Sequence, residues 1–272
     1  MKRLILLLII SCINIFSLVA QDTLSFSWSG NYEAILVPVT VKNSGKAYYM
    51  QFDLGSPVSM IYTNAALGIT GDSMHNYPLQ FHGYLFQPKA IPVKKMAESN
   101  IIGTIGTDLF KDKILVIDYP NRKLVFTNTL PATFNISMHP MYFQQGRILF
   151  PAKLFGKQGV LIFDTGSSAY SLITDSATAV QKSVANSSAI SSRAQSWNQV
   201  LTSYTYPSND SVTLAGKTIP LKKISWFSGV SQAQQEPMRK LGIMGMLGNY
   251  IFLERVVVMD LKKGLWGMVK AG

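Results

Sequence analysis

The chain has 272 residues, of which 47% are hydrophobic and only 14% are charged. This composition excludes a disordered protein, and 12 prolines with 20 glycines exclude a collagen-like or linker-type chain. Lys and Arg number 25 against 14 Asp and Glu, which gives a formal net charge of +11. No run of five like charges concentrates this excess, so a nucleic-acid or membrane-surface binder is the least favoured hypothesis.

The first 20 residues are typical of a secretory signal. Lys2 and Arg3 precede a long apolar run, and the small residue Ala20 ends it. We therefore expect export to the periplasm, the cell surface or the medium. Lipid attachment at Cys12 is the alternative, but the residues after Cys12 stay apolar. No other segment approaches the roughly 18 apolar residues of a spanning helix, so we expect no transmembrane span in the mature chain.

Most familiar catalytic motifs are missing from the sequence. Cys12 is the one cysteine and lies in the expected signal, so the mature chain has no disulfide, cysteine nucleophile or thiolate metal site. The three histidines are scattered, and there is no HExxH, GxSxG, P-loop or GxGxxG pattern. We therefore expect neither a metal nor an organic cofactor, and acidic residues remain as the candidates for chemistry.

The chain repeats itself in three blocks that keep the same order, which would rarely arise by chance. In the first block both copies end in Phe-Asp-x-Gly-Ser, and in the third both carry paired glycines before a segment that ends in Asp. This order predicts a tandem duplication with a longer second copy. The paired blocks are residues 45–56 and 156–167, 89–96 and 217–224, and 102–118 and 244–260.

Both copies consist of short apolar or β-branched segments bounded by Gly, Asn, Ser or Pro, a pattern typical of β-strands. We expect an N-terminal lobe over residues 24–128, a linker over 129–145 and a C-terminal lobe over 146–270. Residues 176–199 are rich in Ser, Ala and Gln, and their pattern leaves helix, loop and disorder open. The predicted strands are 35–41, 48–52, 60–62, 114–117, 147–154, 160–163, 171–173 and 256–259, with short helical turns at 108–111 and 250–254.

The duplication gives Asp53 and Asp164 equivalent places, after an apolar segment and before Gly-Ser. Two similar lobes tend to pack around a pseudo-twofold axis, where a residue can meet its twin. Two carboxylates within hydrogen-bonding reach cannot both ionise cheaply, so they share a proton. One then acts as a base toward water and the other as an acid toward a carbonyl oxygen. The alternative is that each aspartate is a turn residue beside glycine.

Residues 160–168, Val-Leu-Ile-Phe-Asp-Thr-Gly-Ser-Ser, resemble the active-site loop of the pepsin-like and retropepsin-like aspartic proteases. A second signature of that family, two apolar residues and a Gly that cross behind the loop, is matched at 101–103 and 243–245. The resemblance implies an all-β, bilobal, pepsin-like acid-protease fold made of two tandem retropepsin-like β-barrel lobes. It also implies that a polypeptide bound between the lobes is hydrolysed by water activated between Asp53 and Asp164.

The residues around the two aspartates have supporting roles in this interpretation. Gly55 and Gly166 let each loop turn so that its carboxylate faces the axis. Ser56 and Ser167 are placed to donate a hydrogen bond to the aspartate of their own loop. The resemblance also assigns to the Thr165 hydroxyl a contact with the opposite loop.

The first copy departs from the family pattern at Leu54, where Thr or Ser is usual. Thr165 therefore lacks a twin, and we expect either a buried polar group without its partner, at about 1–3 kcal/mol, or repacked loops. The first copy also leaves little room for the hairpin flap of the family. Tyr77 and Tyr84 are the candidates for a flap tyrosine, and a core aromatic on an edge strand is the alternative for both.

Two hypotheses from different classes follow. The first is an exported, monomeric aspartic endopeptidase that acts on extended polypeptides. The second is a catalytically silent peptide-binding or surface-interaction protein with the same fold. Leu54 and the short flap favour the silent protein, whereas two Asp-x-Gly-Ser loops favour the enzyme. Neither hypothesis involves nucleic acid.

Overall fold

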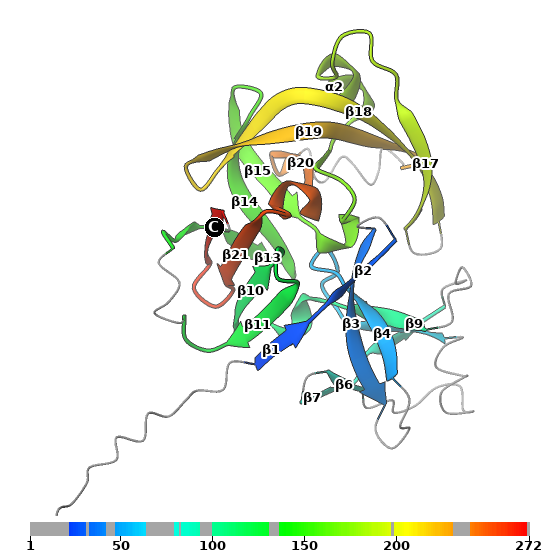
Figure 1. Cartoon of the computed structure of the whole chain (residues 1–272), viewed down its shortest axis with the longest axis vertical. Helices are drawn as coiled ribbons and strands as arrows, with labels where there is room; N and C mark the ends of the chain where they lie inside the picture. Colours follow the sequence, from blue (N-terminus) through cyan, green and yellow to red (C-terminus); the bar gives the residue numbers. More distant parts are fainter. Residues whose placement is uncertain are drawn as a thin grey trace, which may run out of the picture.

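The computed structural model describes residues 22–30, 33–41, 47–63, 79–81, 83–92, 100–130, 136–196, 199–230 and 240–270. These residues are mostly β-strand, and helix α2 (Ser176–Gln181) with three short 3-10 turns are the main helical segments among them (Figure 1). The prediction of an all-β protein is confirmed. The expected signal at residues 1–20 lies outside the described residues. Within the described part, no helix is long and apolar enough to cross a lipid bilayer.

The first half of the chain forms one eight-stranded sheet, in which β2 (Ser27–Ser29) pairs with β3 off the main path. Its buried face is built by alternation, since Met50 and Phe52 of one strand point into the core and the residue between them does not. In sheet order the other strands are β7 (Tyr84–Phe86), β6 (Leu79–Phe81), β3 (Ala34–Val41), β4 (Ala47–Phe52), β9 (Ile101–Ile105), β5 (Met60–Tyr62) and β8 (Lys89–Ile91).

The second half forms another eight-stranded sheet, which has longer strands. Residues 176–199, left open by the sequence, contain α2 and β17, and β17 forms one edge of this sheet. In sheet order the strands are β13 (Tyr142–Gln144), β14 (Arg147–Leu154), β15 (Lys157–Phe163), β20 (Ile243–Leu247), β16 (Leu172–Ile173), β19 (Lys217–Ser228), β18 (Gln199–Leu214) and β17 (Ile190–Ser196).

The two eight-stranded sheets follow the same plan. The order β3-β4-β9-β5-β8 in one matches β14-β15-β20-β16-β19 in the other. The parallel pairs β4–β9 and β15–β20 even share an irregularity, which falls between Tyr49 and Met50 in the first and between Val160 and Leu161 in the second. These positions are equivalent in the first repeat block, so the repeat in the sequence corresponds to a repeat in strand pairing.

The second repeat block does not keep its register in the structure. Ile61 faces Ala90 across β5 and β8, whereas Leu172, the twin of Ile61, faces Ile224 across β16 and β19. The second repeat block aligns Ala90 with Thr218 in the sequence. In the structure, Ala90 is instead the counterpart of Ile224. Both segments lie at the start of a strand, and likeness at the start of a strand does not fix its register.

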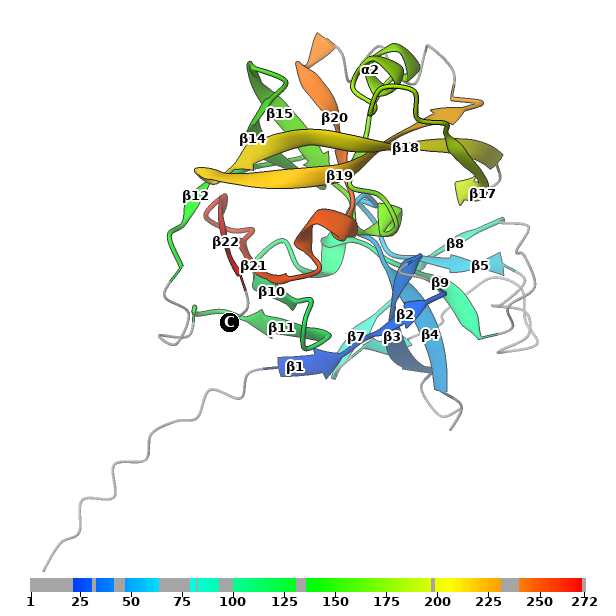
Figure 2. The same ribbon diagram turned by 45° about the horizontal axis from the view of Figure 1, so that its top comes forward.

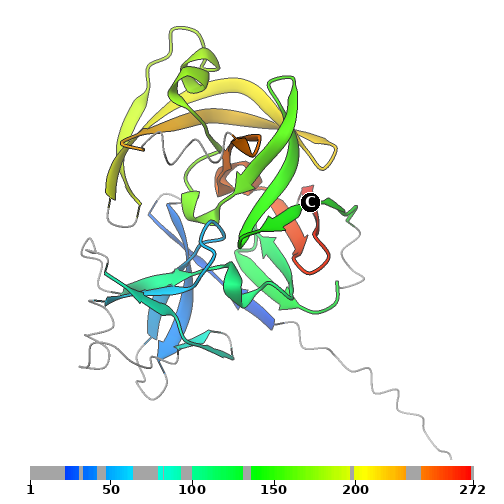
Figure 3. The same cartoon turned by 180° about the vertical axis from the view of Figure 1, so that it is seen from behind.

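A six-stranded sheet combines strands from both halves (Figures 1, 2 and 3). At its centre β10 and β21 run antiparallel, and Val116 lies opposite Val258, its own twin in the third repeat block. This self-pairing is the mark of a local twofold axis. In sheet order the strands are β1 (Asp22–Ser25), β11 (Lys123–Thr127), β10 (Ile114–Asp118), β21 (Arg255–Asp260), β22 (Leu265–Lys270) and β12 (His139–Pro140).

The predicted linker at 129–145 contains two short strands, β12 and β13. β12 pairs with β22 and β13 pairs with β14, so both join strands of the second half. Strands of two and three residues show no periodic pattern in the sequence, since alternation needs a longer run to be recognised.

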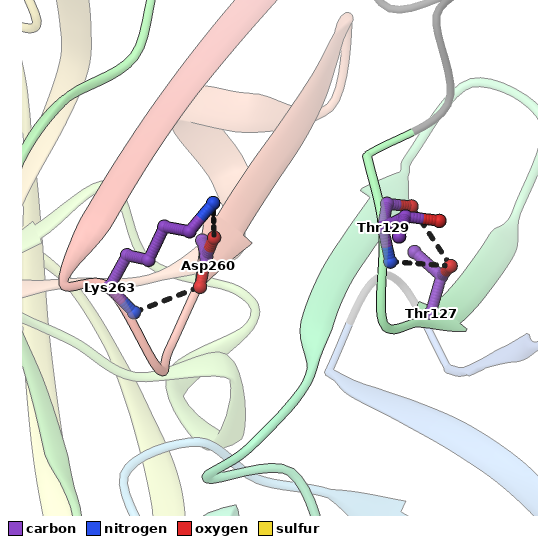
Figure 4. Close-up of polar contacts among 4 residues, drawn as sticks. All are labelled: Thr127, Thr129, Asp260 and Lys263. Atoms are coloured by element: carbon purple, nitrogen blue, oxygen red, sulfur yellow. Dashed lines mark hydrogen bonds and ion pairs between the residues drawn. The ribbon is translucent and has the colours of Figure 1, made fainter.

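The acidic residues that end β10 and β21 close turns. Asp260 Oδ1 accepts a hydrogen bond from the Lys263 backbone N–H at 2.9 Å, and the lysine ammonium lies 3.7 Å from Oδ2 (Figure 4). Asp118, its twin, accepts the backbone N–H of Asn121 at 3.0 Å. This repeated pair of acids therefore stabilises two hairpins.

Thr127 closes the turn that leads out of β11 (Figure 4). Its hydroxyl donates to the carbonyl oxygen of Thr129 at 2.9 Å and accepts the Thr129 backbone N–H at 3.3 Å. The local hydrogen bonds end the strand before the chain leaves for the second half.

Aromatic side chains fill much of the core. Trp266 of β22 is 1% exposed and stacks on Phe150 of β14 with ring centroids 3.6 Å apart. Phe150 also stacks on Phe163 at the end of β15, the strand that leads into the second repeated Asp-x-Gly-Ser loop. The stack of Trp266, Phe150 and Phe163 therefore joins the six-stranded sheet to the second eight-stranded sheet. It also packs against the end of the strand that leads into the loop.

We expect Trp266→Ala to lower the free energy of unfolding by about 3–5 kcal/mol, because it removes a large buried ring and leaves a cavity. Urea denaturation followed by circular dichroism measures the change. Leu241→Ala is the control, since Leu241 is 68% exposed and its loss should change the free energy by less than about 0.5 kcal/mol. Equal effects of the two substitutions would contradict this description of the core.

Candidate functional site

Asp53 lies where the chain leaves β4. Its backbone N–H donates to the carbonyl oxygen of Ile105 at 3.0 Å, which ties the loop to the end of β9. Its carboxylate oxygen Oδ1 accepts the backbone N–H groups of Gly55 at 2.9 Å and Ser56 at 3.2 Å. The loop therefore holds this carboxylate in one orientation.

Asp164 lies in the matching place after β15. Its backbone N–H donates to the carbonyl oxygen of Leu247 at 2.9 Å, at the end of β20. Oδ1 accepts the Gly166 N–H at 2.7 Å, and Oδ2 accepts the Ser167 hydroxyl at 2.8 Å. The hydrogen bond expected between Ser167 and its own aspartate is present.

Ser56 does not repeat the role of Ser167. Its hydroxyl donates to the carbonyl oxygen of Val58 at 2.7 Å, and only its backbone N–H reaches Asp53. The expectation of a hydroxyl donor to Asp53 was therefore wrong, because Val58 offers a local acceptor that the serine side chain reaches first. Asp53 consequently lacks a side-chain donor of the kind that Asp164 has in Ser167.

Each carboxylate occupies the space beside the glycine of the opposite loop. A Cβ atom on Gly166 would lie 2.6 Å from Cγ of Asp53, and one on Gly55 would collide with the carboxylate of Asp164. Both positions therefore require a residue without a side chain. The structure brings the two predicted aspartates together.

The pKa of Asp53 is raised well above the usual range for aspartate. Burial is the largest cause, followed by the negative charge of Asp164 and a hydrogen bond with its side chain. Hydrogen bonds from the N–H groups of Gly55 and Ser56 lower the pKa of Asp53, but by less than the other causes raise it. Two close carboxylates that share one proton show this behaviour. Both aspartates nevertheless keep part of their residue surface exposed to solvent.

Thr165 links the two loops. Its hydroxyl accepts the backbone N–H of Leu54 at 2.8 Å and donates to the carbonyl oxygen of Phe52 at 2.8 Å. Thr165 is fully buried, and its partners lie at the end of β4 and in the first loop. The predicted contact of Thr165 with the opposite loop is therefore present in the structure.

Leu54 is fully buried in the hydrophobic core. Thr165 itself keeps two partners, because it bonds to backbone groups that any residue at position 54 would supply. The two expected outcomes, a buried polar group left unpaired opposite Leu54 or repacked loops, stay predictions for the backbone groups. Among the described residues, the buried side-chain nitrogen and oxygen atoms without a hydrogen-bond partner are Ser171 Oγ and Trp226 Nε1. Neither atom belongs to the two aspartate loops.

A second layer of polar residues, which sequence reasoning missed, holds the second loop. The Asn249 amide donates to the carbonyl oxygen of Thr165 at 3.0 Å and to the Ser168 hydroxyl at 2.7 Å. The buried Tyr119 hydroxyl donates to Asn249 Oδ1 at 2.7 Å. Thr107 occupies the place of Asn249 in the first half, and its hydroxyl donates to the carbonyl oxygen of Gly146 at 2.6 Å.

The glycines that cross behind the loops are Gly106 and Gly248, which corrects the assignment to 101–103 and 243–245. A Cβ atom on Gly106 would lie 2.8 Å from the carbonyl oxygen of Ser56, and one on Gly248 would collide with that of Ser167. Each block contains two glycines three residues apart, so the pattern alone could not show which one meets the loop. The later glycine does so because β9 and β20 end just before it.

The side chains of the two candidates for a flap tyrosine lie outside the description, so this assignment stays a prediction. Tyr77 lies outside the described residues, and Tyr84 begins β7, an edge strand of the first sheet. Tyr62, at the end of β5, is a tyrosine whose pKa is affected by the charge of Asp53. Burial raises the pKa of Tyr62, a hydrogen bond with Thr104 opposes the rise, and the charge of Asp53 adds to it.

The described residues contain no group of three His, Cys, Asp or Glu side chains that could hold a metal ion. Among solved structures, the fold is similar to that of conglutin gamma, described as a unique basic 7S globulin from lupine seeds. The TM-score is 0.53 over 92% of this chain and 94% of that chain, at 11% sequence identity. At such low identity the likeness shows the fold alone. No protein-family model and no curated protein matches the sequence.

We expect Thr165→Val to lower the free energy of unfolding by about 1–3 kcal/mol or more, because it leaves a buried N–H and a buried carbonyl oxygen unpaired. Urea denaturation measures the loss. Thr213→Val is the matched control, since the Thr213 hydroxyl meets only Thr218 in an exposed pair on neighbouring strands. A loss no larger than that of the control would show that Thr165 does not join the loops.

Proposed function

We propose that the protein is an exported aspartic endopeptidase in which Asp53 and Asp164 activate water for the hydrolysis of peptide bonds. The placement of each carboxylate against the glycine of the opposite loop carries the proposal. The raised pKa of Asp53, for which Asp164 is in part responsible, supports it. A pair that holds one proton contains both the acid and the base that amide hydrolysis needs.

The hydrogen bonds favour different roles for the two aspartates. Asp164 accepts a backbone N–H and the Ser167 hydroxyl, which stabilise a negative charge. Asp164 therefore acts as the base and takes a proton from water as the water oxygen attacks the carbonyl carbon. Asp53, which retains its proton, donates it to the carbonyl oxygen. The tetrahedral intermediate then collapses as a proton passes to the leaving amine.

The architecture proposed with this activity is the bilobal acid-protease fold, with lobes over 24–128 and 146–270. The common strand order of the two eight-stranded sheets supports two similar lobes. The pairing of Val116 with Val258 supports a twofold axis between them. In this arrangement an extended polypeptide binds between the lobes and across the aspartate pair.

A catalytically silent peptide-binding protein is the second candidate, and one observation favours it. The Ser56 hydroxyl bonds to Val58, so Asp53 receives no hydroxyl hydrogen bond from its own loop, whereas Asp164 receives one from Ser167, and the two halves of the site are not equivalent. Leu54 adds to this asymmetry. Catalysis depends on the geometry of the reacting groups to within a fraction of an ångström, so such a difference bears on activity.

Cleavage of an unfolded, disulfide-free protein between pH 3 and pH 8 tests the proposal. We expect Asp53→Asn and Asp164→Asn each to lower the rate by about 10²–10⁴-fold, because each removes one partner of the proton transfer. Asp112→Asn is the control, since Asp112 is exposed and lies in neither loop. Full activity in both dyad variants would exclude the pair as the catalyst. A folded, inactive wild type that still binds peptides would favour the silent protein.

A further inference from the structure

One face of β19 meets two tyrosines next to the second aspartate loop. Lys223 and Phe227 lie on this face, because side chains two and four residues apart share a face of a strand. The Lys223 ammonium lies 3.4 Å from the centre of the Tyr250 ring. The Phe227 ring meets Tyr170 edge to face, with centroids 5.1 Å apart. These four residues are named the β19 cluster.

The β19 cluster is attached to the loop that carries Asp164. The Tyr250 backbone N–H donates to the carbonyl oxygen of Tyr170 at 3.2 Å, and the Tyr170 N–H donates to that of Ser167 at 3.2 Å. Ser167 in turn donates to Asp164. Figures 1 and 2 show the short turn after β20, which includes Tyr250, lying beside β19. The cluster therefore flanks the proposed catalytic pair on the side of the second half.

The opposite face of β19 carries Ile224 and Trp226, while Ser225, on the same face as the cluster, is also buried. Ile224 is fully buried in the core, and Trp226 stacks on Tyr204 with centroids 4.5 Å apart. The four residues of the β19 cluster are all partly exposed, as Trp226 is, whereas Ile224 is not. A large aromatic surface that keeps its contact with water beside a reactive pair is suited to hold a ligand.

The Lys223 ammonium lacks an anionic partner in the described part of the chain, where the ion pairs are Lys263–Asp260 and Lys270–Glu254. The amine of Lys223 is partly removed from water, and this burial lowers its pKa to about 8. The Tyr250 ring face supports the positive charge but leaves the outward N–H groups free of a carboxylate. A carboxylate is the group that completes such a site.

We propose that the β19 cluster binds an acidic residue of the bound polypeptide, with the substrate carboxylate paired to Lys223 and its aliphatic part against the Phe227 and Tyr170 rings. The inference rests on the proposed binding of peptides at Asp53 and Asp164. It makes the protein selective for chains that carry Glu or Asp at one fixed distance from the scissile bond.

The test is direct peptide binding in an Asp164→Asn background, which prevents cleavage. The probes are ten-residue peptides in which Glu or Gln occupies each position in turn. We expect one position at which Glu binds about tenfold more tightly than Gln, because an ion pair with a hydrogen bond replaces a neutral contact. Lys223→Met should abolish the preference and Lys223→Arg should retain it, with circular dichroism reporting the fold.

Lys222→Met is the matched control, since Lys222 is adjacent but exposed, and it should leave the preference unchanged. Equal binding of Glu and Gln at every position, in a protein whose wild type cleaves peptides, would overturn the inference and leave the proposed function standing. Survival of the preference in Lys223→Met would overturn it as well. Absence of both peptide binding and cleavage in the parent protein would overturn the two together.

Discussion

Two carboxylates approach each other in this protein because each lies beside a residue that has no side chain. A methyl group on Gly55 or Gly166 would occupy the space of the opposite aspartate. Burial and, after it, the negative charge of Asp164 raise the pKa of Asp53. Every chemical property proposed for the site follows from this contact.

The rest of the fold keeps the two glycine loops in place. Each loop follows a strand that pairs in parallel with a neighbour, β4 with β9 and β15 with β20. The six-stranded sheet joins the halves through the self-pairing of Val116 and Val258. Thr165 then joins the loops themselves with two hydrogen bonds. A single threonine is sufficient for this link because its partners are backbone groups.

The duplication made the aspartate pair predictable, since the pattern Phe-Asp-x-Gly-Ser occurs twice, each time after a segment with strand character. The polar residues behind the loops were not predictable in this way. Asn249 and Thr107 occupy equivalent places but differ in type, so a search for repeated residues passes over them. Ser56 was predicted by analogy with Ser167, and a local acceptor at Val58 decided otherwise.

Register was the other limit of the sequence. The glycines at 103 and 106 are repeated together at 245 and 248, and only the ends of β9 and β20 decide which of them crosses behind the loop. The second repeat block, residues 89–96 and 217–224, aligns β8 with β19 at a position six residues away from the observed pairing. Periodicity identifies which segments are strands, but tertiary packing sets how far each one slides along its neighbour.

The titration of Asp53, followed by carboxyl carbon NMR in the wild type and in Asp164→Asn, tests the central contact most directly. The structure predicts a lower pKa for Asp53 in the variant, because the neighbouring negative charge is gone while burial remains. Asp112→Asn, which removes an exposed charge, should leave the titration unchanged. An Asp53 pKa that is the same in the wild type and in Asp164→Asn would contradict the face-to-face placement of the two carboxylates.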